Sequence, residues 1–533
     1  MSSSQTHALL QPKVSDASRV SFLTLFSLIL ACGISYAAYQ LFNDLAGVRI
    51  ASSLAPLLLG VALLIALAFE FVNGFHDTAN AVATVIYTNS LKPHAAVVWS
   101  GIWNFAGVML ASGTVAFGII ALLPVELILQ VGSAAGFAMV FALLFAAIIW
   151  NVGTWYFGLP ASSSHTLIGS VIGVGLMNQL IEHGSKTSGV DWSQAVRIGY
   201  SLLLSPVIGF TCAALLLLAA RALLRNPELY RAPQGQQPPP FWTRAVLILT
   251  CTGVSFAHGS NDGQKGMGLI MLILIGTVPT AYALNLAVPP QHVQTFVTDS
   301  QSVARTLEGY AGPLVRVDSV AEPREELARY LKSREFTQAT LVGLHAMIGE
   351  VSQEVSRYGA YSRMPDEMRG NVRNDMYLVS ESLRLMDRSG IPHFMPPDRK
   401  MLAHYRKDLD HATKYIPGWV KVAVAMALGL GTMIGWRRIV ITVGEKIGKQ
   451  HLTYAQGASA ETVAMSTIAA ADAFGLPVST THVLSSGVAG TMAANRAGLQ
   501  WITVRNVLTA WLLTLPMSIL LAGVLYWLFR QAL

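Results

Sequence analysis

Apolar stretches long enough to cross a lipid bilayer recur along the whole of this 533-residue chain. A helix needs about 20 predominantly apolar residues to span the hydrocarbon core. Shorter apolar pieces lie between the long ones, so we expect roughly ten to twelve membrane segments. Only 12% of the residues are charged, where a soluble globular protein carries about 25%. These features predict an all-α polytopic membrane protein. The long stretches cover residues 20–42, 51–72, 95–123, 134–157, 195–224, 242–258, 266–287, 416–436 and 504–529.

The first apolar stretch begins like a signal peptide but continues for too long. Lys13 and Arg19 precede it, and apolar residues run from Phe22 to Leu41. The apolar region of a signal peptide has only about 7–15 residues. We therefore expect residues 1–50 to hold an N-terminal tail and a retained first membrane helix.

Two motifs occur twice in the chain, in the same order. Residues 71–80 (FVNGFHDTAN) align with 256–265 (FAHGSNDGQK), and residues 158–165 (GLPASSSH) align with 475–482 (GLPVSTTH). Each copy of the second motif leads into helix-like sequence rich in small residues. Self-similarity of this kind indicates a duplication. In membrane proteins it is typical of transporters with two inverted repeats that enclose a site near the middle of the bilayer.

The spacing of the motifs locates an insertion in the second copy. Asp77 and His165 are 88 positions apart, whereas Asp262 and His482 are 220 apart, so the second copy is 132 residues longer. The excess falls at residues 288–415, which hold 34 of the 65 charged side chains of the chain. Helical periodicity within it predicts a helical insert outside the membrane.

These observations divide the chain into a series of segments. After residues 1–50 we expect the first transport repeat at 51–225 and a loop at 226–241. The second repeat then occupies 242–287 and 416–533, on either side of the insert.

Basic residues cluster in two of the loops. Cytoplasmic loops of membrane proteins are rich in Lys and Arg, so we expect both loops to face the cytoplasm. The formal net charge of +7 needs no nucleic acid to explain it. The clusters consist of Arg221, Arg225, Arg231 and Arg244, and of Arg437, Arg438, Lys446 and Lys449.

The repeated motifs combine helix-breaking and polar residues inside apolar surroundings. Non-helical backbone is tolerated at membrane depth only where it lines a protein cavity. Gly74 and Gly259 permit a break in their helices, and we expect further half-helices to begin near Ser163 and Thr480. The N-termini of such half-helices carry free N–H groups and a positive dipole end, which together favour an anion.

The paired carboxylates Asp77 and Asp262 suggest what accompanies the anion. Isolated charges in the membrane are costly, so ionisable residues there are functional by default. Beside an oxyanion, two carboxylates imply protons, coupling cations or a metal that travels with the substrate. His165 and His482 are either proton carriers or structural donors, and Glu70, whose repeat partner is Ser255, is a one-sided candidate for proton handling. Glu461 and Asp472 could merely line the cavity.

At these residues the chain resembles the PiT family of inorganic phosphate transporters. The resemblance rests on residues 75–88 (FHDTANAVATVIYT), on 259–265 (GSNDGQK) and on both proline-containing motifs, so it covers both halves. It is nearest to the bacterial low-affinity permeases of the cytoplasmic membrane. It implies a homodimer that takes up phosphate with protons, often as a complex with a divalent metal such as Mg, Ca, Zn or Mn. Asp77 and Asp262 would then hold the metal.

The resemblance also implies which side chains contact the substrate and where this chain departs from the family. Sodium-coupled relatives keep Asn at the end of both motifs, whereas here Lys265 stands opposite Asn80. A fixed ammonium could take the electrostatic place of sodium, which favours protons over sodium as the coupling ion. In the other interpretation Lys265 only pairs with Asp77 or Asp262. The implied substrate contacts are Asp77, Asn80, Ser163, Ser164, Asp262, Thr480 and Thr481.

Other functions compete with proton-coupled phosphate uptake. Within transport they are sodium-coupled phosphate symport and sulfate permeation, because a related branch resembles sulfate permeases. A different class would be an intramembrane metalloenzyme that uses His76, Asp77, His258 and Asp262, although no nucleophile and base are evident. A pure channel is a further alternative, but a pore has no need for paired helix breaks.

Overall fold

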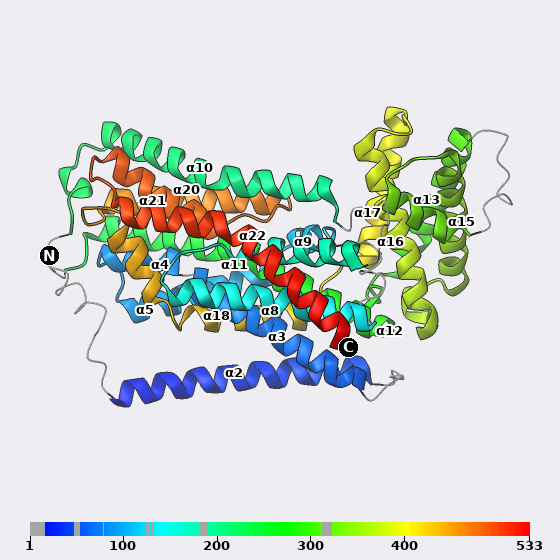
Figure 1. The fold of residues 1–533 in the computed structure, drawn as a ribbon, viewed down its shortest axis with the longest axis horizontal. Coiled ribbons are helices and arrows are strands. Elements are labelled where there is room, and N and C mark those ends of the chain that lie inside the picture. Colours follow the sequence, from blue (N-terminus) through cyan, green and yellow to red (C-terminus); the bar gives the residue numbers. More distant parts are fainter. Residues whose placement is uncertain are drawn as a thin grey trace.

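A computed structural model of the chain is all-helical. It describes residues 16–46, 54–77, 79–123, 128, 133–181, 190–233, 235, 237–311 and 322–532. Figure 1 shows two parts: a bundle whose helices follow the long axis, and a smaller group of helices at one end. The bundle consists of two sequence-related halves, and the smaller group lies between two helices of the second half.

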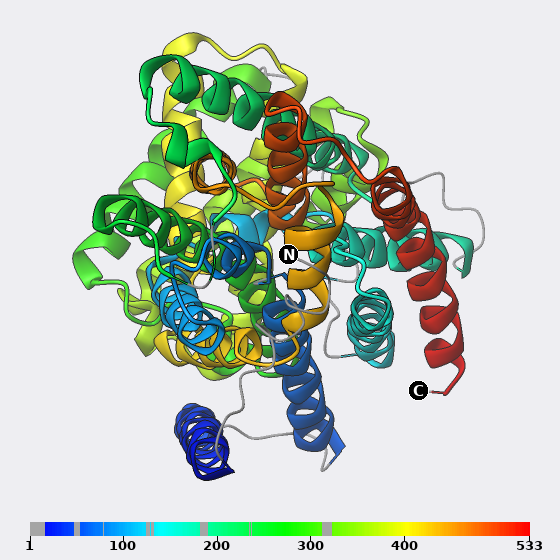
Figure 2. The same cartoon turned by 90° about the vertical axis from the view of Figure 1, so that its left-hand side faces the viewer.

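The first half follows an N-terminal helix, α2, that lies at the edge of the bundle. Figure 2 shows α2 set apart from the other helices, and none of its apolar window is buried. Such a helix meets lipid on most of its surface. After α2 (Asp16–Leu45), the described helices of this half are α3 (Leu54–Asp77), α4 (Ala79–Tyr87), α5 (Pro93–Leu110), α6 (Thr114–Ile120), α8 (Ala134–Tyr156), α9 (Ser163–Ile181) and α10 (Trp192–Leu223).

The second half repeats this order around the insert. A short helix, η1 (Pro227–Tyr230), lies in the loop between the halves. The second half then comprises α11 (Phe241–Thr277), α12 (Pro279–Tyr282), α18 (Gly418–Thr432), α19 (Arg437–Ile441), η4 (Thr442–Lys446), α20 (Tyr454–Ala473), α21 (Thr480–Ala494) and α22 (Trp501–Ala532).

Equivalent helices of the two halves run in opposite directions. In Figure 1, α10 runs from the insert end of the bundle to the other end, whereas α22 runs back toward the insert end. Both helices have 32 residues and an internal proline, Pro206 in α10 and Pro516 in α22. The halves also exchange partners, because α10 packs on α21 and α22 packs on α9. The expected inverted repeat is therefore visible in the packing.

Glycines let the exchanged helices approach closely. A Cβ atom on Gly173 of α9 would lie 2.1 Å from the carbonyl oxygen of Ile519, and one on Gly490 of α21 would lie 2.1 Å from that of Phe210. Gly173 and Gly490 occupy the same position in their repeats, eight residues after the motif histidine. Small residues at helix crossings are typical of membrane bundles, where van der Waals packing replaces the hydrophobic effect.

The structure corrects two expectations about helix breaks. Residues 242–258 and 266–287 were expected to be separate spans, but α11 runs without interruption from Phe241 to Thr277. The other expectation was a break at Gly74 and at Gly259. Gly74 lies inside α3, which ends at Asp77, and a Cβ on Gly259 would lie 2.1 Å from the carbonyl oxygen of Asn104. Both glycines serve close helix packing rather than helix breaking.

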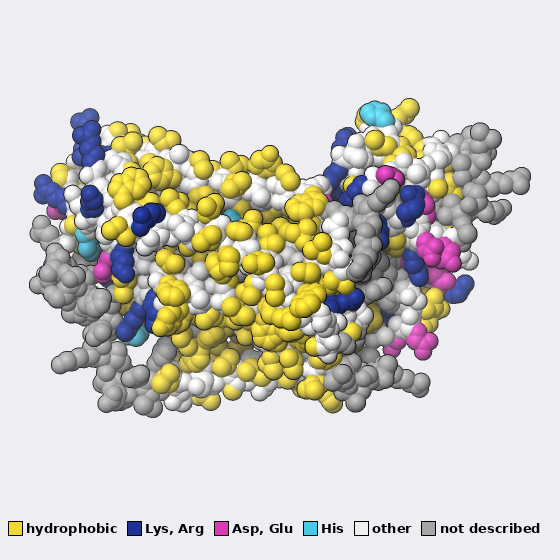
Figure 3. Space-filling model, viewed as in Figure 1, with side chains coloured by type: hydrophobic (Ala, Val, Ile, Leu, Met, Phe, Trp, Pro, Cys, Tyr) yellow, Lys and Arg dark blue, Asp and Glu magenta, His cyan; other side chains and the backbone are white. Residues whose placement is uncertain are grey.

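The surface of the bundle is mostly apolar. Figure 3 shows hydrophobic side chains over its middle and charged side chains gathered at its two ends. Five described helices are long and apolar enough to cross a membrane, or up to seven if each bent pair is one span. The expected ten to twelve segments also count helices that are shorter or more polar, such as α9, α11 and α21, and that number stays a prediction.

The insert is helical and has its own apolar core. Its helices are α13 (Pro290–Ala311), α14 (Pro323–Ser333), α15 (Gln338–Tyr358), η3 (Tyr361–Arg363), α16 (Asp366–Ser389) and α17 (Pro396–Thr413). Leu307, Leu344, Val379 and Leu409 are among the fully buried residues of this core. The periodicity noted in the sequence corresponds to α14 and α15.

An ion-pair cluster joins the insert to the bundle. Asp191, the N-cap of α10, accepts a hydrogen bond from Arg384 of α16 at 3.0 Å, and Arg334 lies 3.6 Å from the same oxygen. Burial raises the pKa of Asp191, but the hydrogen bond from Ser193 and the charges of Arg334 and Arg384 outweigh it and lower the pKa to about 2. The carboxylate therefore stays charged at neutral pH and holds the insert on α10.

Candidate functional site

The two half-helices of the second motif begin with the same cap. In α9 the hydroxyl oxygen of Ser162 accepts a hydrogen bond from the N–H of His165 at 3.2 Å. In α21 the hydroxyl oxygen of Ser479 accepts one from the N–H of His482, also at 3.2 Å. The helices begin at Ser163 and at Thr480, as expected from the sequence. Each thus directs first-turn N–H groups, which have no partner within their own helix, toward the interior.

Asp77 lies where α3 ends, between these two half-helices. Its Oδ2 accepts a hydrogen bond from Ser163 at 2.5 Å, and its Oδ1 accepts one from Thr481 at 2.8 Å. His76 Nδ1 lies 2.7 Å from the same Oδ1, and its Nε2 lies 3.1 Å from the hydroxyl of Thr154. The carboxyl group is almost fully buried. One carboxylate therefore connects the half-helices of both repeats.

Asp262 approaches the same place from α11. Its Oδ2 lies 2.7 Å from Lys265 Nζ and 3.5 Å from the hydroxyl of Ser163. Lys265 in turn donates a hydrogen bond to Ser163 at 3.3 Å. Both charged side chains are fully buried. Within the described part of the chain Asp262 Oδ1 has no hydrogen-bond partner, so one carboxylate oxygen is left for another ligand.

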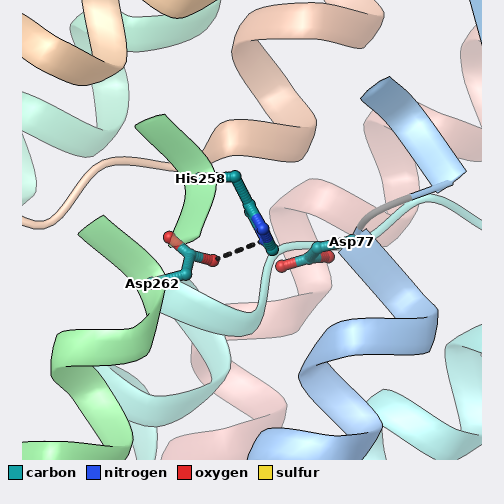
Figure 4. A group of neighbouring side chains, drawn as sticks. All are labelled: Asp77, His258 and Asp262. Carbon is teal, nitrogen blue, oxygen red and sulfur yellow. Dashed lines mark ion pairs between the residues drawn. The ribbon is translucent and has the colours of Figure 1, made fainter. Parts of the chain in front are cut away.

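A histidine completes the group around the two carboxylates. Figure 4 shows His258 between Asp77 and Asp262, and its Nε2 lies 3.4 Å from Asp262 Oδ2. One ligand atom from each of the three residues lies within 4.8 Å of the others. The Asn104 amide is oriented by its Nδ2, which donates to the Ser100 carbonyl, so its Oδ1 accepts from His258 Nδ1 at 2.6 Å. His258 Nε2 is then free to face a cation.

The remaining expected substrate contacts differ in how they are used. The hydroxyl of Ser164 donates to the carbonyl oxygen of Val478 at 2.7 Å, so it links the two half-helix loops. Thr480 Oγ1 is buried and has no hydrogen-bond partner among the described residues. Asn80 belongs to α4, but its side chain lies outside the described residues. Of the expected substrate contacts, four side chains therefore lie together, at the distances given above: Asp77, Ser163, Asp262 and Thr481.

The expected coupling residues all lie inside the bundle. Glu70 is fully buried and packs against Gly266, the residue after Lys265: a Cβ on Gly266 would lie 2.6 Å from a carboxylate oxygen of Glu70. The rings of His165 and His482 lie 4.5 Å apart, so the two repeats meet through their motif histidines. His482 also stacks on Trp511 at 4.0 Å.

Two acidic residues of α20 connect it to α11. Glu461 accepts hydrogen bonds from Thr250, at 2.5 Å, and from Thr84. Asp472 accepts them from Ser260 and from Gln264, both at 2.6 Å. These contacts fit the interpretation of both residues as lining rather than as ligands.

His258 was not among the expected substrate or coupling residues. It was considered only for a metalloenzyme. The signal that could have found it is its spacing, since residues four apart share one face of a helix and His258 precedes Asp262 by four. Its alignment with Asn73 in the first repeat obscured this signal.

Comparison with known proteins separates a transporter from an enzyme. Residues 73–522, most of the chain, match the phosphate transporter family. The chain belongs to this family. Its members are transporters, so this family member is not an enzyme, and the resemblance drawn from the motifs is confirmed.

Individual relatives cover nearly the whole chain. The low-affinity inorganic phosphate transporters PitA and PitB of Escherichia coli K12 are each 42% identical to it, over 89% of this chain and 98% and 97% of theirs. A probable low-affinity inorganic phosphate transporter of Bacillus subtilis is 28% identical, over 87% of this chain and 95% of its own.

One solved structure also matches this phosphate transporter family member. It is described as the sodium-dependent phosphate transporter, and it covers 89% of this chain and 100% of its own with a TM-score of 0.50. The sequences are 19% identical, so the match supports the helical fold alone.

Proposed function

We propose that this chain imports inorganic phosphate across the bacterial cytoplasmic membrane by alternating access, driven by protons. The observation that carries the proposal is the position of Asp77. Its carboxylate accepts hydrogen bonds from Ser163 of one repeat and Thr481 of the other, with Asp262 close by. A site made by both repeats at once can open to either side as the repeats move.

The chemistry of this site suits a protonated oxyanion. The first turns of α9 and α21 supply N–H donors, and the hydroxyls of Ser163 and Thr481 add to them. Asp77 and Asp262 are acceptors, so they can receive hydrogen bonds from phosphate, which carries protons at neutral pH. Fully ionised sulfate has no proton to donate to the two carboxylates, of which Asp262 is paired with an ammonium group, that of Lys265. Phosphate is therefore preferred over sulfate.

A divalent metal can accompany the phosphate as cargo. Asp77, His258 and Asp262 offer two carboxylate oxygens and one imidazole nitrogen within reach of one ion. Such mixed ligands suit Zn²⁺ or Mn²⁺, whereas Mg²⁺ and Ca²⁺ prefer oxygen ligands alone. A metal bound here would bridge the carboxylates and the phosphate oxygens, and so remove the repulsion between them.

Proton coupling is proposed from the position of Lys265. Its ammonium lies 2.7 Å from Asp262 Oδ2 in a fully buried position. A permanent positive charge there supplies the compensation that a sodium ion would supply, so uptake needs no sodium. Glu70 and the pair His165 and His482 are the proposed proton carriers, since they are the other buried ionisable groups expected to couple transport.

The orientation in the membrane follows from the basic loops. The loop after α10 and the segment from α19 to η4 carry the two clusters of Lys and Arg, and both lie at the end of the bundle opposite the insert. Since such loops face the cytoplasm, the insert lies on the outer side. The homodimer expected from the family resemblance is part of the proposal.

Uptake into proteoliposomes tests the coupling and the substrate together. Purified protein is reconstituted, and labelled phosphate uptake is followed under a proton gradient alone and under a sodium gradient alone. We expect uptake to follow the proton gradient, to persist without sodium and to collapse with a protonophore. Strict dependence on sodium would refute the proposed role of Lys265.

Competition identifies the substrate. In counterflow, unlabelled phosphate inside the vesicles drives the entry of labelled phosphate. An excess of unlabelled phosphate added outside should abolish this entry, whereas the same excess of sulfate added outside should leave it nearly unchanged. Equal competition by sulfate would contradict the proposed preference. Saturable exchange at a slow turnover would in addition exclude an open pore.

A further inference from the structure

Outside the membrane bundle, a second group of metal-ligating side chains lies on the insert. Asp299 belongs to α13, and His404 and Asp408 belong to α17. One ligand atom from each of the three lies within 4.8 Å of the others, and His404 Nε2 lies 3.8 Å from Asp408 Oδ2. The cluster shares no residue with the site around Asp77.

Helix packing brings these side chains together. The two helices are in contact, with the ring of Phe296 from α13 stacked on that of Tyr405 from α17 at 5.4 Å. The hydroxyl of Ser300 donates to that of Tyr405 at 3.0 Å. Asp299 and His404 are the neighbours of these residues in sequence, so buried contacts fix the backbone that carries the ligands. A metal site requires such positioning.

The negative charge of the cluster is poorly compensated. Among the ion pairs of the described residues, none joins Asp299 or Asp408 to a lysine or an arginine. Asp408 Oδ2 is buried and has no hydrogen-bond partner within the described part of the chain. A divalent cation would neutralise both carboxylates.

Two more histidines lie on the same helix faces. His411 follows His404 by seven residues on α17, and His292 precedes Asp299 by seven on α13. Residues seven apart lie on one face of a helix. Both histidines are within electrostatic range of Asp408. Both lie outside the group of three residues whose ligand atoms are within 4.8 Å of one another.

We propose that Asp299, His404 and Asp408 bind a divalent transition metal, with Zn²⁺ as the preferred ion. One imidazole nitrogen and two carboxylate oxygens are ligands that Zn²⁺ accepts, and the imidazole disfavours Mg²⁺ and Ca²⁺. At zinc–ligand distances of about 2.0–2.1 Å, tetrahedral ligands lie about 3.3 Å apart. The ligand atoms of the three residues already lie within 4.8 Å of one another, so a small movement brings them to this separation. The His404 side chain can make the movement because it is 68% exposed.

The bound metal would join the first and last helices of the insert. α13 begins shortly after the membrane helix α11, and α17 ends shortly before α18. A ligand that binds only the folded state stabilises it in proportion to the logarithm of its concentration over its Kd. The structural consequence is therefore an insert that is more stable when zinc is bound.

Zinc binding to the purified full-length protein, without a histidine tag, tests the proposal. Competition with a chromophoric chelator gives the affinity, and metal analysis gives the number of ions per chain. We expect His404→Ala and Asp408→Asn each to weaken zinc binding at this site at least tenfold. Each variant should therefore carry one zinc per chain fewer than the wild type. His393→Ala is the matched control, because this exposed histidine lies in the same insert outside the cluster.

The membrane site requires a second control. The double variant Asp262→Asn/Lys265→Asn removes a ligand from the cluster around Asp77 without leaving a buried charge unpaired, and it should leave the zinc of the insert in place. Zinc should also raise the thermal unfolding temperature of the wild type and of His393→Ala by more than that of His404→Ala, in which only the membrane site is left to bind zinc. Because the His404 side chain is largely exposed, its removal should leave the fold intact. Wild-type zinc binding by both His404→Ala and Asp408→Asn, or no zinc on the insert at all, would overturn the proposal, whatever the outcome for transport.

Discussion

Removing the charge of Lys265 should destabilise the protein strongly, and removing its partner as well should restore it. Lys265 Nζ lies 2.7 Å from Asp262 Oδ2, and both side chains are fully buried. Loss of one member of a buried ion pair costs about 3–5 kcal/mol, because the other charge is left uncompensated. Replacing both members by neutral groups is often close to neutral.

The structure indicates why nothing else would compensate Asp262. After Lys265→Asn the nearest groups to its Oδ2 are His258 Nε2 at 3.4 Å and the Ser163 hydroxyl at 3.5 Å, both beyond a good hydrogen bond. Its Oδ1 has no hydrogen-bond partner within the described residues. The single variants Lys265→Asn and Asp262→Asn should each be less stable by about 3–5 kcal/mol, and the double variant should lie within about 1 kcal/mol of the wild type.

Thermal unfolding of the purified protein measures this double-mutant cycle, with and without sodium. Lys265→Asn leaves carboxylates that a cation can approach, so sodium should raise its unfolding temperature relative to choline chloride of equal ionic strength. The wild type and the double variant should respond much less. In proteoliposomes, any residual uptake by Lys265→Asn should become sensitive to sodium.

Two results would refute this reasoning. If Lys265→Asn unfolds at the wild-type temperature, the ion pair with Asp262 contributes nothing to stability. If the double variant is as unstable as the single ones, the loss comes from packing and not from an uncompensated charge. A sodium effect of equal size in all variants would be unrelated to Lys265.

Four further predictions concern other parts of the molecule. Asp77→Asn should abolish phosphate uptake while the protein still elutes as a folded species in size-exclusion chromatography; near-normal uptake would remove it from the site. Replacing residues 288–415 by a short flexible linker should leave phosphate binding measurable, and a folded deletion variant without binding would show that the insert contributes to the site. Gly173→Ala should cost about 1–3 kcal/mol in thermal unfolding, because its Cβ would lie 2.1 Å from a carbonyl oxygen, whereas the control Gly199→Ala, with no atom within 4 Å, should change little. The pKa of Asp191 falls from 3.8 to about 2 on folding, so its contribution to insert docking should be complete above pH 4 and disappear as pH falls toward 2; hydrogen exchange of the insert should show this in the wild type but not in Asp191→Asn.

The sequence by itself determined the class of fold and most of its plan. Apolar stretches of spanning length require helices, because backbone groups in lipid must bond within their own segment. The duplicated motifs predicted two related halves, and their unequal spacing located the insert at 288–415. Helix starts at Ser163 and Thr480 were also predictable, since a proline and a capping serine precede each. These are local properties, which is why sequence patterns carry them.

Only the tertiary structure decided how the halves meet. From the sequence we expected helix breaks at Gly74 and Gly259. A glycine that permits a break and a glycine that permits close packing look the same in a sequence. The crossing of α11 with α5 makes Gly259 a packing residue, and α11 stays continuous.

Contacts between segments that are distant in the chain could not be predicted from the sequence either. The sequence left open whether Lys265 pairs with Asp77 or Asp262, and the structure places it on Asp262. His258 beside Asp77, and Asp299 beside Asp408, depend on which helix faces turn toward each other. Register and rotation of packed helices arise from side-chain packing over the whole bundle, and no local pattern encodes them.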